Sequence, residues 1–286
     1  MFNRTNGDFG SYVDQGKPSA NAFPASRGYH CTVFSPINQS LIIFGGAANV
    51  NGWVPLNDLW AYNMTSLMWT WLGGNGSIYQ PDKYSSSNNF AYPGGRMYSA
   101  CTYVASTNSI FIFGGQDANG AVTNQLIEYK LNTRSWSLKQ PMPPGLVWPT
   151  LVSYNDEYLV LFGGGSSTLT VNTSYMWFYQ IINHVWTEKI IPTNLAPRYI
   201  HSGVFDSDRR VMYIFGGYKW GNTLTNELWE FNITGYQWKL LNPVTSPFIS
   251  ARAGALMVYN SISKSINIFA GQNNGNHRTF TSYFAI

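Results

Sequence analysis

Few side chains in this sequence are suited to chemistry: the 286 residues include four histidines, two cysteines and thirteen acids. His30 and His201 each stand three residues after an arginine, Arg27 and Arg198, so they share one position in a recurring frame. Such recurrence indicates a structural or channel-lining role rather than catalysis. Most acids, Asp58 among them, stand in turns or at the starts of expected strands, where turn chemistry explains them. We therefore expect no catalytic residue, no metal and no cofactor.

The elements that position these residues are marked by an apolar run that ends in a glycine pair. LIIFGG, IFIFGG, YLVLFGG and VMYIFGG are four copies, and INIFAG is a fifth in which Ala270 replaces the first glycine. The phenylalanines of these runs are separated by 69, 49, 53 and 54 residues. A fixed period of this size indicates a repeat architecture. The phenylalanine markers are Phe44, Phe113, Phe162, Phe215 and Phe269.

Two further marks share this period. In four copies a tryptophan follows a Tyr or Phe by seven residues, and that aromatic lies 14 to 16 residues after the second glycine. The pairs are Tyr62 with Trp69, Tyr129 with Trp136, Tyr179 with Trp186, and Phe231 with Trp238. An arginine also stands 17 residues before four of the phenylalanines, whereas the third copy has Trp148 near that place. These arginines are Arg27, Arg96, Arg198 and Arg252.

These residues resemble the kelch repeat, and the resemblance covers essentially the whole chain. It implies an all-β fold, a β-propeller with one four-stranded blade per repeat. Composition agrees: 10% charged residues, 16% aromatics and 27 glycines suit short, tightly packed strands better than helices. We expect the four tryptophans at equivalent, largely buried sites on outermost strands. We also expect each arginine to find a carbonyl or carboxylate acceptor.

We predict one propeller domain over residues 1–286, with five recognisable blades near 27–72, 96–140, 148–190, 198–241 and 252–286. Residues 1–26 align with the link between the first two blades, which places Phe2 on Trp71 of a fourth strand. The last blade lacks its outermost strand. An open strand edge exposes unpaired backbone groups, so we expect a strand or subunit from elsewhere to complete it.

The two cysteines, Cys31 and Cys101, follow the equivalent arginines of adjacent blades by four and five residues. Their spacing matches no zinc motif. A disulfide needs Cα atoms within about 7 Å, and the inner strands of neighbouring blades are expected to diverge. The interpretation is two small buried thiols, with a bridge left open as the less favoured alternative.

An enzymatic alternative comes from kelch-like copper oxidases that resemble galactose oxidase. These need two Tyr, two His and a Cys cross-linked to one Tyr. The residues of this sequence that could form such a site are Tyr29, His30, Cys31, Tyr98, Cys101 and His201. The accessory domain that accompanies such sites is absent from this sequence. We therefore expect a non-catalytic binding or scaffold protein.

The resemblance implies that the fourth-to-first and second-to-third strand links share one face of a kelch propeller. Exposed aromatics beside Asn, His and Arg on these loops suit a protein or a glycan partner, through stacking and hydrogen bonds. The loops could equally pack on one another. The expected ligand-binding residues are Trp53, Tyr218, Trp220, Asn222, Asn273, Asn274, His277 and Arg278.

An alternative is an extracellular, glycosylated structural or adhesive component of a larger assembly. Six Asn-x-Ser/Thr sequons support it, and Asn63 and Asn232 share one position in the turn between third and fourth strands. No run of basic residues points to nucleic acid, and no apolar stretch is long enough for membrane insertion. Extracellular localisation is slightly favoured over cytoplasmic. The sequons begin at Asn3, Asn38, Asn63, Asn75, Asn172 and Asn232.

Overall fold

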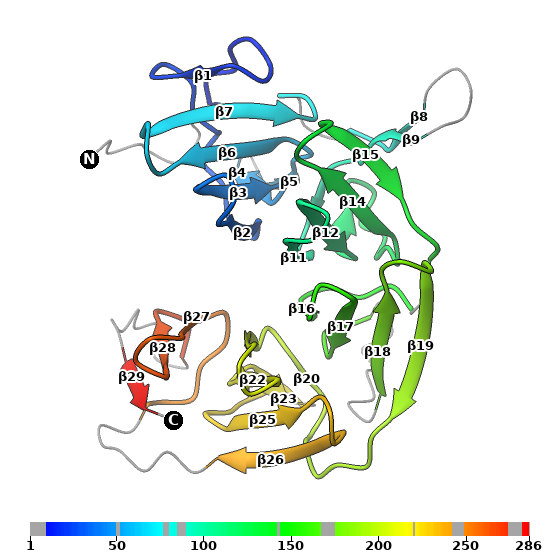
Figure 1. Cartoon of the computed structure of the whole chain (residues 1–286), viewed down its shortest axis with the longest axis vertical. Helices are drawn as coiled ribbons and strands as arrows, with labels where there is room; N and C mark the ends of the chain where they lie inside the picture. The colour runs from blue at the N-terminus through cyan, green and yellow to red at the C-terminus, as the bar shows by residue number, and fades with distance from the viewer. Residues whose placement is uncertain are drawn as a thin grey trace. The chain divides into compact units, whose positions relative to one another are not determined.

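The structure is a computed structural model in which strands form antiparallel sheets (Figure 1). The chain divides into two compact units, residues 1–147 and 148–286, each with its own set of sheets. No helix in the described part of the chain has the length and apolar composition needed to cross a membrane. The described residues are 10–49, 52–76, 80–84, 90–141, 144–166, 175–219, 221–241, 249–273 and 282–285.

The first unit contains two four-stranded blades. The first blade runs β2 (Cys31–Ser35), β3 (Ser40–Phe44), β6 (Leu59–Asn63) and β7 (Met68–Gly73), with β1 (Pro18–Ser19) added outside β7. The second runs β11 (Ala100–Val104), β12 (Ser109–Phe113), β14 (Leu126–Lys130) and β15 (Ser135–Leu138). Short ladders join the loops: β4 (Ala47–Asn49) with β5 (Trp53–Pro55), β8 (Lys83–Tyr84) with β9 (Phe90–Tyr92), and β10 (Arg96–Met97) with β13 (Gln116–Asp117).

The second unit contains the remaining three blades. The third blade is β16 (Thr150–Tyr154), β17 (Tyr158–Phe162), β18 (Tyr175–Gln180) and β19 (Val185–Ile190). The fourth is β21 (Ser202–Asp206), β22 (Val211–Phe215), β25 (Leu228–Asn232) and β26 (Gln237–Leu241). The fifth has three strands among the described residues: β27 (Leu256–Asn260), β28 (Ser265–Phe269) and β29 (Ser282–Ala285). A loop sheet joins β20 (Arg198–Tyr199), β23 (Tyr218–Lys219) and β24 (Thr223–Leu224).

The blades have the predicted register. Each tryptophan lies on the fourth strand, directly opposite the aromatic residue seven positions earlier, with ring centroids 4.6 to 5.1 Å apart. The expected burial is reached only by Trp186, which is 7% exposed, while the other three are half-buried. Cross-strand aromatic pairs of this kind stabilise a sheet.

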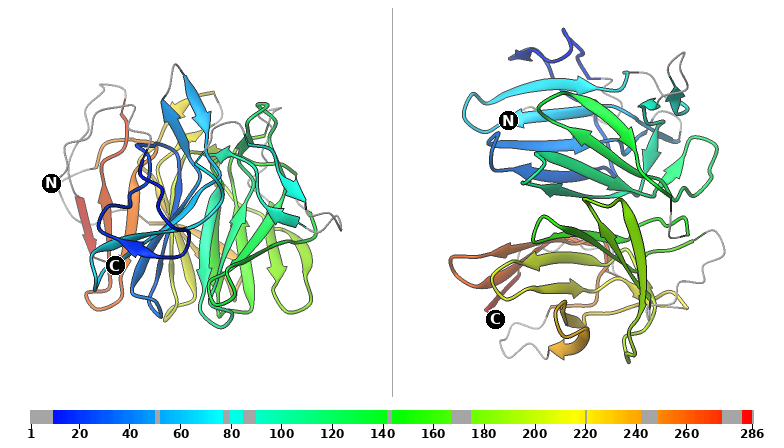
Figure 2. Two further views of the ribbon diagram at one scale, coloured as in Figure 1. Left: turned by 90° about the horizontal axis from the view of Figure 1, so that it is seen from above. Right: turned by 45° about the vertical axis from the view of Figure 1, so that its right-hand side comes forward.

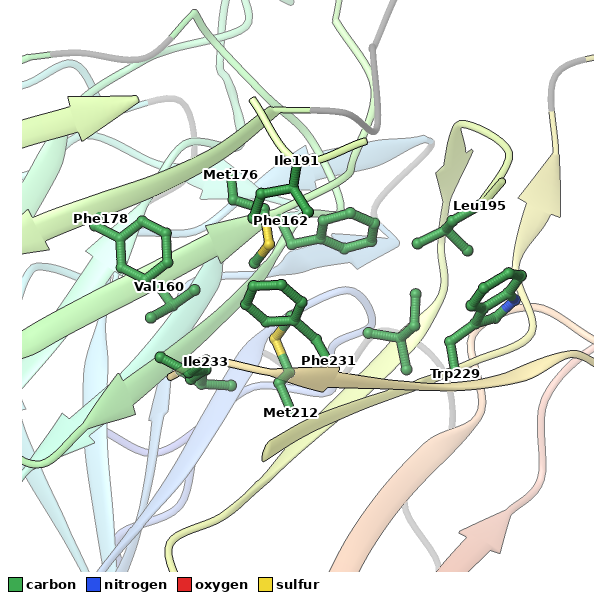
Figure 3. Packing of buried hydrophobic residues seen from close by; sticks show 12 residues of the cluster. Val160, Phe162, Met176, Phe178, Ile191, Leu195, Met212, Trp229, Phe231 and Ile233 are labelled. Atoms are coloured by element: carbon green, nitrogen blue, oxygen red, sulfur yellow. The ribbon is translucent and has the colours of Figure 1, made fainter. Parts of the chain in front are cut away.

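Within each unit the sheets pack face to face, as Figure 2 shows, because their middle strands are apolar on both sides. Phe44 of the first blade contacts Trp136 of the second, with ring centroids 5.6 Å apart. Figure 3 shows the corresponding core between the third and fourth blades, where Phe162 and Met176 face Met212 and Phe231. Burial of such side chains is the main force that holds blades together.

The glycine pairs connect each blade to the start of the next. Gly46 donates its N–H to the carbonyl of Arg96 over 3.0 Å. Gly45 has φ +61°, and a Cβ there would lie 2.6 Å from the same carbonyl, so a side chain would break this junction. The equivalent carbonyl of the third blade belongs to Leu146, which accepts from Gly115 over 2.8 Å. The residue equivalent to the arginine is therefore Leu146, two residues before Trp148, which the sequence placed near that position.

Candidate binding site

The four repeat-frame arginines hold the backbone at the glycine-pair end of their blades. Each Nε donates to the carbonyl two residues earlier, at Ala25, Gly94, Ala196 and Ser250 respectively. In three blades Nη1 also donates to the carbonyl eighteen residues later, at Gly45, Gly216 and Ala270. Every guanidinium therefore has the acceptors expected of it. A shared set of partners makes a structural role the physical reason for the recurrence.

Two of these arginines also pair with acids, Asp58 and Glu227, that stand directly before strands as expected, but turn chemistry alone does not account for them. Asp58 accepts from Arg27 at both oxygens, at 2.5 and 2.7 Å, and both side chains are buried. Glu227 accepts from Arg198 at 2.7 Å. Each acid also accepts from the indole of the tryptophan two residues later, Trp60 or Trp229. Bidentate and charge-assisted bonds of this kind are strong and directional.

The links before the first two blades each add one partner to these arginine sites. Tyr12 donates its hydroxyl to Asp58 at 2.5 Å. Burial beside that carboxylate raises the pKa of Tyr12 above its usual range. In the second blade the carboxylate that pairs with the arginine is Asp82, 3.0 Å from Arg96. Gln125 stands at the position that Glu227 occupies in the fourth blade, and it donates to Asp82 at 2.6 Å.

A polar pocket of about 350 Å³ opens beside this second arginine site. It is formed by the link before the second blade and by the loop between β13 and β14. Carboxylates, amides and one guanidinium can both donate and accept hydrogen bonds there. The lining residues are Gln80, Pro81, Asp82, Gly94, Arg96, Asp117, Ala118, Asn119, Thr123 and Gln125.

An aromatic group lies at the same glycine-pair end of the first unit. The ring of Tyr29 lies 4.8 Å from that of Trp53 and 4.7 Å from that of Tyr98, measured between centroids. Tyr29 is 46% exposed and Trp53 is 47% exposed. We call Tyr29, Trp53 and Tyr98 the first aromatic group. Large, partly exposed rings present an apolar face and a polar edge to a ligand.

A second aromatic group lies within the second unit and includes two of the expected ligand-binding residues. The ring of Tyr199 lies 5.9 Å from that of Trp148 and 5.5 Å from that of Tyr218. Its hydroxyl donates to Asn222 Oδ1 at 2.5 Å. Asn273 follows Gln272, which is paired with Ala253 in the fifth blade. Trp220, Asn274, His277 and Arg278 lie outside the described residues.

Tyr29, Tyr98, Tyr199 and Trp148 were missing from the expected ligand-binding set. The sequence could have identified them by position. Each follows a repeat-frame arginine, or Leu146 in the third blade, by one or two residues. Tyr29, Tyr98 and Trp148 share an unusual backbone conformation, with φ of +59°, +65° and +55°. Ile200 and Gly254 have the same conformation at the corresponding positions of the fourth and fifth blades.

Cys31 and Cys101 form a disulfide, contrary to the favoured interpretation of two free thiols. Their Cα atoms are 5.8 Å apart. The first strands of the two blades do not diverge at this end, because Tyr98 donates its N–H to the Tyr29 carbonyl at 3.1 Å. The cysteines follow that bond by only two and three residues. The bridge thus lies two and three residues along the chain from Tyr29 and Tyr98 of the first aromatic group.

The disulfide also bears on the oxidase-like constellation, since neither sulfur is available for a bond to tyrosine. His201 is buried and contacts Thr150 Oγ1 at 2.9 Å through Nε2, while Nδ1 has no hydrogen-bond partner among the described residues. Burial, together with the positive charge of Arg198, lowers the pKa of His201 to about 3. Across the described ranges, no three His, Cys, Asp or Glu side chains come together in a way that could hold a metal.

The repeated four-stranded sheets and the glycine-pair junctions define a kelch-type β-propeller. A family model, the KLHDC2/KLHL20/DRC7 Kelch-repeats domain, matches residues 86–260, and the chain belongs to that family.

Relatives with different overall lengths share this region. Multiple epidermal growth factor-like domains protein 8 of Mus musculus is 26% identical over 75% of this chain and 8% of its own length. Kelch domain-containing protein 10 of Xenopus laevis is 25% identical over 71% of this chain and 47% of its own. Putative protein tag-53 of Caenorhabditis elegans is 22% identical over 78% of this chain and 16% of its own length. The chain spans less than half the length of each.

Proposed function

We propose that this chain binds a segment of a partner protein through the aromatic groups at the glycine-pair ends of its blades. The observation that carries this proposal is the first aromatic group, in which Tyr29 and Trp53 are each about half exposed although their rings touch. Tyr and Trp dominate the energetics of protein interfaces, because they bury a large area with few rotatable bonds.

The polar pocket supports a peptide as the ligand. It lies at the same end of the second blade as Tyr98, and its carboxylates, amides and guanidinium can bond a peptide backbone or polar side chains. Only 10% of the residues are charged. We therefore expect the affinity to depend weakly on salt, since charge pairs screened by ions contribute little.

We place this binding activity in an oxidising, extracellular compartment. The Cys31–Cys101 disulfide supports that placement, because disulfides persist in secreted proteins and are rare in the cytosol. The name of the mouse relative points the same way, since epidermal growth factor-like domains are disulfide-dense secreted modules.

Selection from a displayed library of short linear peptides, followed by titration of the enriched peptides, tests the binding proposal. We expect Trp53→Ala to weaken an enriched peptide by at least about tenfold, as removal of an interface anchor does. Leu67→Ala is the matched control: Leu67 is also exposed in the first blade, but it follows Asn63 at the opposite end of β6 from Leu59. Its substitution should leave the affinity unchanged.

Two results would overturn the proposal. One is enrichment of peptides whose affinity is the same for wild type and Trp53→Ala. The other is failure of the library to yield a binder while a panel of soluble oligosaccharides binds wild type and is lost in Trp53→Ala, which would assign the aromatic face to a glycan.

A further inference from the structure

The sequons differ in what their asparagine side chains do in the folded protein. N-linked glycosylation replaces one hydrogen of the Asn Nδ2 group with a sugar, and the sugar needs open solvent around that nitrogen. Four of the six sequon asparagines lie among the described residues, namely Asn38, Asn63, Asn75 and Asn232; Asn3 and Asn172 lie outside them.

Three of the four use Nδ2 to hold the fold. Asn38 Nδ2 donates to Ser35 Oγ at 2.9 Å, and Asn75 Nδ2 donates to Gln80 Oε1 at 2.9 Å. Asn63 Nδ2 donates to the carbonyl of Asn38 at 3.1 Å. A glycan on any of these nitrogens would have to share the space of a native hydrogen bond.

Asn232 is arranged differently. It ends β25 and is exposed, as is Thr234, the hydroxyl residue of its sequon. Its Oδ1 accepts the N–H of Gly235 at 2.8 Å, which fixes the carbonyl side of the amide toward the turn. No hydrogen bond from Nδ2 is found within the described residues.

Asn63 and Asn232 form a matched pair within the chain, because both occupy the same turn of the repeat and both accept turn N–H groups at Oδ1. They differ in the cross-strand residue. Ser40 stands opposite Asn63 and offers a hydroxyl oxygen, whereas Val211 stands opposite Asn232 and offers none. Asn63 Nδ2 thus has two acceptors, the Asn38 carbonyl at 3.1 Å and Ser40 Oγ at 3.5 Å, and no such acceptor is found for Asn232 Nδ2 among the described residues.

We propose that Asn232 carries an N-linked glycan in the mature protein, an inference that rests on the extracellular compartment proposed above. Nδ2 forms a bond to the anomeric carbon of a sugar donated as a lipid-linked pyrophosphate. The bond between that carbon and the phosphate oxygen breaks, the lipid pyrophosphate leaves with the bonding electrons, and the transferase takes up the proton from Nδ2.

The glycan would cover the hairpin end of the fourth blade. In β25, Asn232 pairs with Val211 at one end, while Leu228 pairs with Phe215 beside the glycine pair at the other. Tyr218 and Asn222 of the second aromatic group follow that glycine pair. The sugar therefore marks the end of the blade opposite the aromatic loops and leaves the proposed binding face open.

Expression through the secretory pathway of cultured insect cells tests the site. Enzymatic release of glycans in heavy-oxygen water converts each occupied asparagine to labelled aspartate, which peptide mass spectrometry counts. We expect Asn232 to be occupied in most molecules, and Asn63 in few. Thr234→Ala should lower the intact mass by one glycan, and the matched variant Thr65→Ala should leave it unchanged. An unlabelled Asn232, or labelling of Asn63 as complete as that of Asn232, would overturn the inference.

A second measurement on the same sample distinguishes failure of the glycan proposal from failure of the compartment proposal. A peptide map without reductant reports whether Cys31 and Cys101 are joined. A bridged protein with an empty Asn232 defeats only the glycan, whereas free thiols in protein secreted by these cells defeat the compartment argument. Titration of an enriched peptide on Asn232→Gln should give the wild-type affinity, and a loss would show that the glycan-bearing end takes part in binding.

Discussion

At the scale of single residues, three aromatics stand where the backbone favours glycine. Tyr29, Tyr98 and Trp148 have left-handed φ values, and the fifth blade has Gly254 at the same place. A bulky side chain in that region costs roughly 1 kcal/mol or more. Because the turn is common to all five blades, the fold requires the conformation but not the ring. In the first unit the rings at this position, Tyr29 and Tyr98, contact each other, and Tyr29 stays 46% exposed, which is the arrangement the binding proposal uses.

His201 makes the stability depend on pH with a definite sign. Its pKa is lowered to about 3 in the folded protein, first by burial and then by the positive charge of Arg198, from 6.5 in the unfolded chain. Between these values the unfolded chain binds a proton that the native protein does not. Stability is therefore lost as pH falls from 6.5 toward 3, by about 2 kcal/mol at pH 5.

Urea unfolding at pH 7 and pH 5 measures this loss. In His201→Gln the part of the stability loss between pH 7 and pH 5 that His201 causes should disappear, because glutamine does not titrate. The burial of Glu227 would raise its carboxyl pKa, but hydrogen bonds from Lys219 and Arg198 outweigh burial and lower it to about 2. Its contribution is therefore lost only below pH 4.5. An equal loss at pH 5 in wild type and His201→Gln would show that His201 is protonated in the native protein.

At the scale of elements, the periodic residues predicted the blades well. The seven-residue step from aromatic to tryptophan is the cross-strand pair of the third and fourth strands, so spacing alone gave the register. The sequence located the start of the third blade only approximately, because this blade lacks the arginine and its first hairpin, between Tyr154 and Tyr158, is one residue shorter than the others. Only the backbone bond to Leu146 reveals the equivalent position.

The ion pairs and the disulfide could not be predicted in the same way. Asp58 lies 31 residues after Arg27, while Glu227 lies 29 residues after Arg198. Such a pair is visible only once the third strand has been placed beside the arginine. The cysteines depend on how closely two blades approach at one end, which loop hydrogen bonds determine. Sequence spacing contains no information on that approach.

The bridge between β2 and β11 should add substantially to stability. It closes a loop with a sequence separation of 70 residues. Restricting the unfolded chain over such a loop is worth roughly 4 kcal/mol in the chain-entropy account. The double variant Cys31→Ser with Cys101→Ser should unfold at a correspondingly lower urea concentration than wild type. A double variant as stable as wild type would contradict a stabilising contribution from the bridge.

At the scale of the molecule, the fifth blade ends on an open strand among the described residues. β29 pairs with β28 only, whereas β25 of the fourth blade lies between β22 and β26. Phe2, the residue aligned with a fourth strand, lies outside the described residues. In an antiparallel ladder successive N–H groups point to alternate sides. An edge strand therefore leaves every second amide to solvent, and such edges recruit other chains.

Hydrogen exchange measured by mass spectrometry should detect this open edge. We expect residues 282–285 of β29 to exchange about half of their amides rapidly, because only the N–H groups that face β28 are bonded. The peptide over 228–232 should stay protected throughout, since β25 has partners on both sides. Equal protection of the two peptides at every protein concentration would contradict the open edge and show that a strand from the same chain covers β29. Protection of residues 282–285 that rises with protein concentration would instead identify a second copy as the strand that completes the blade.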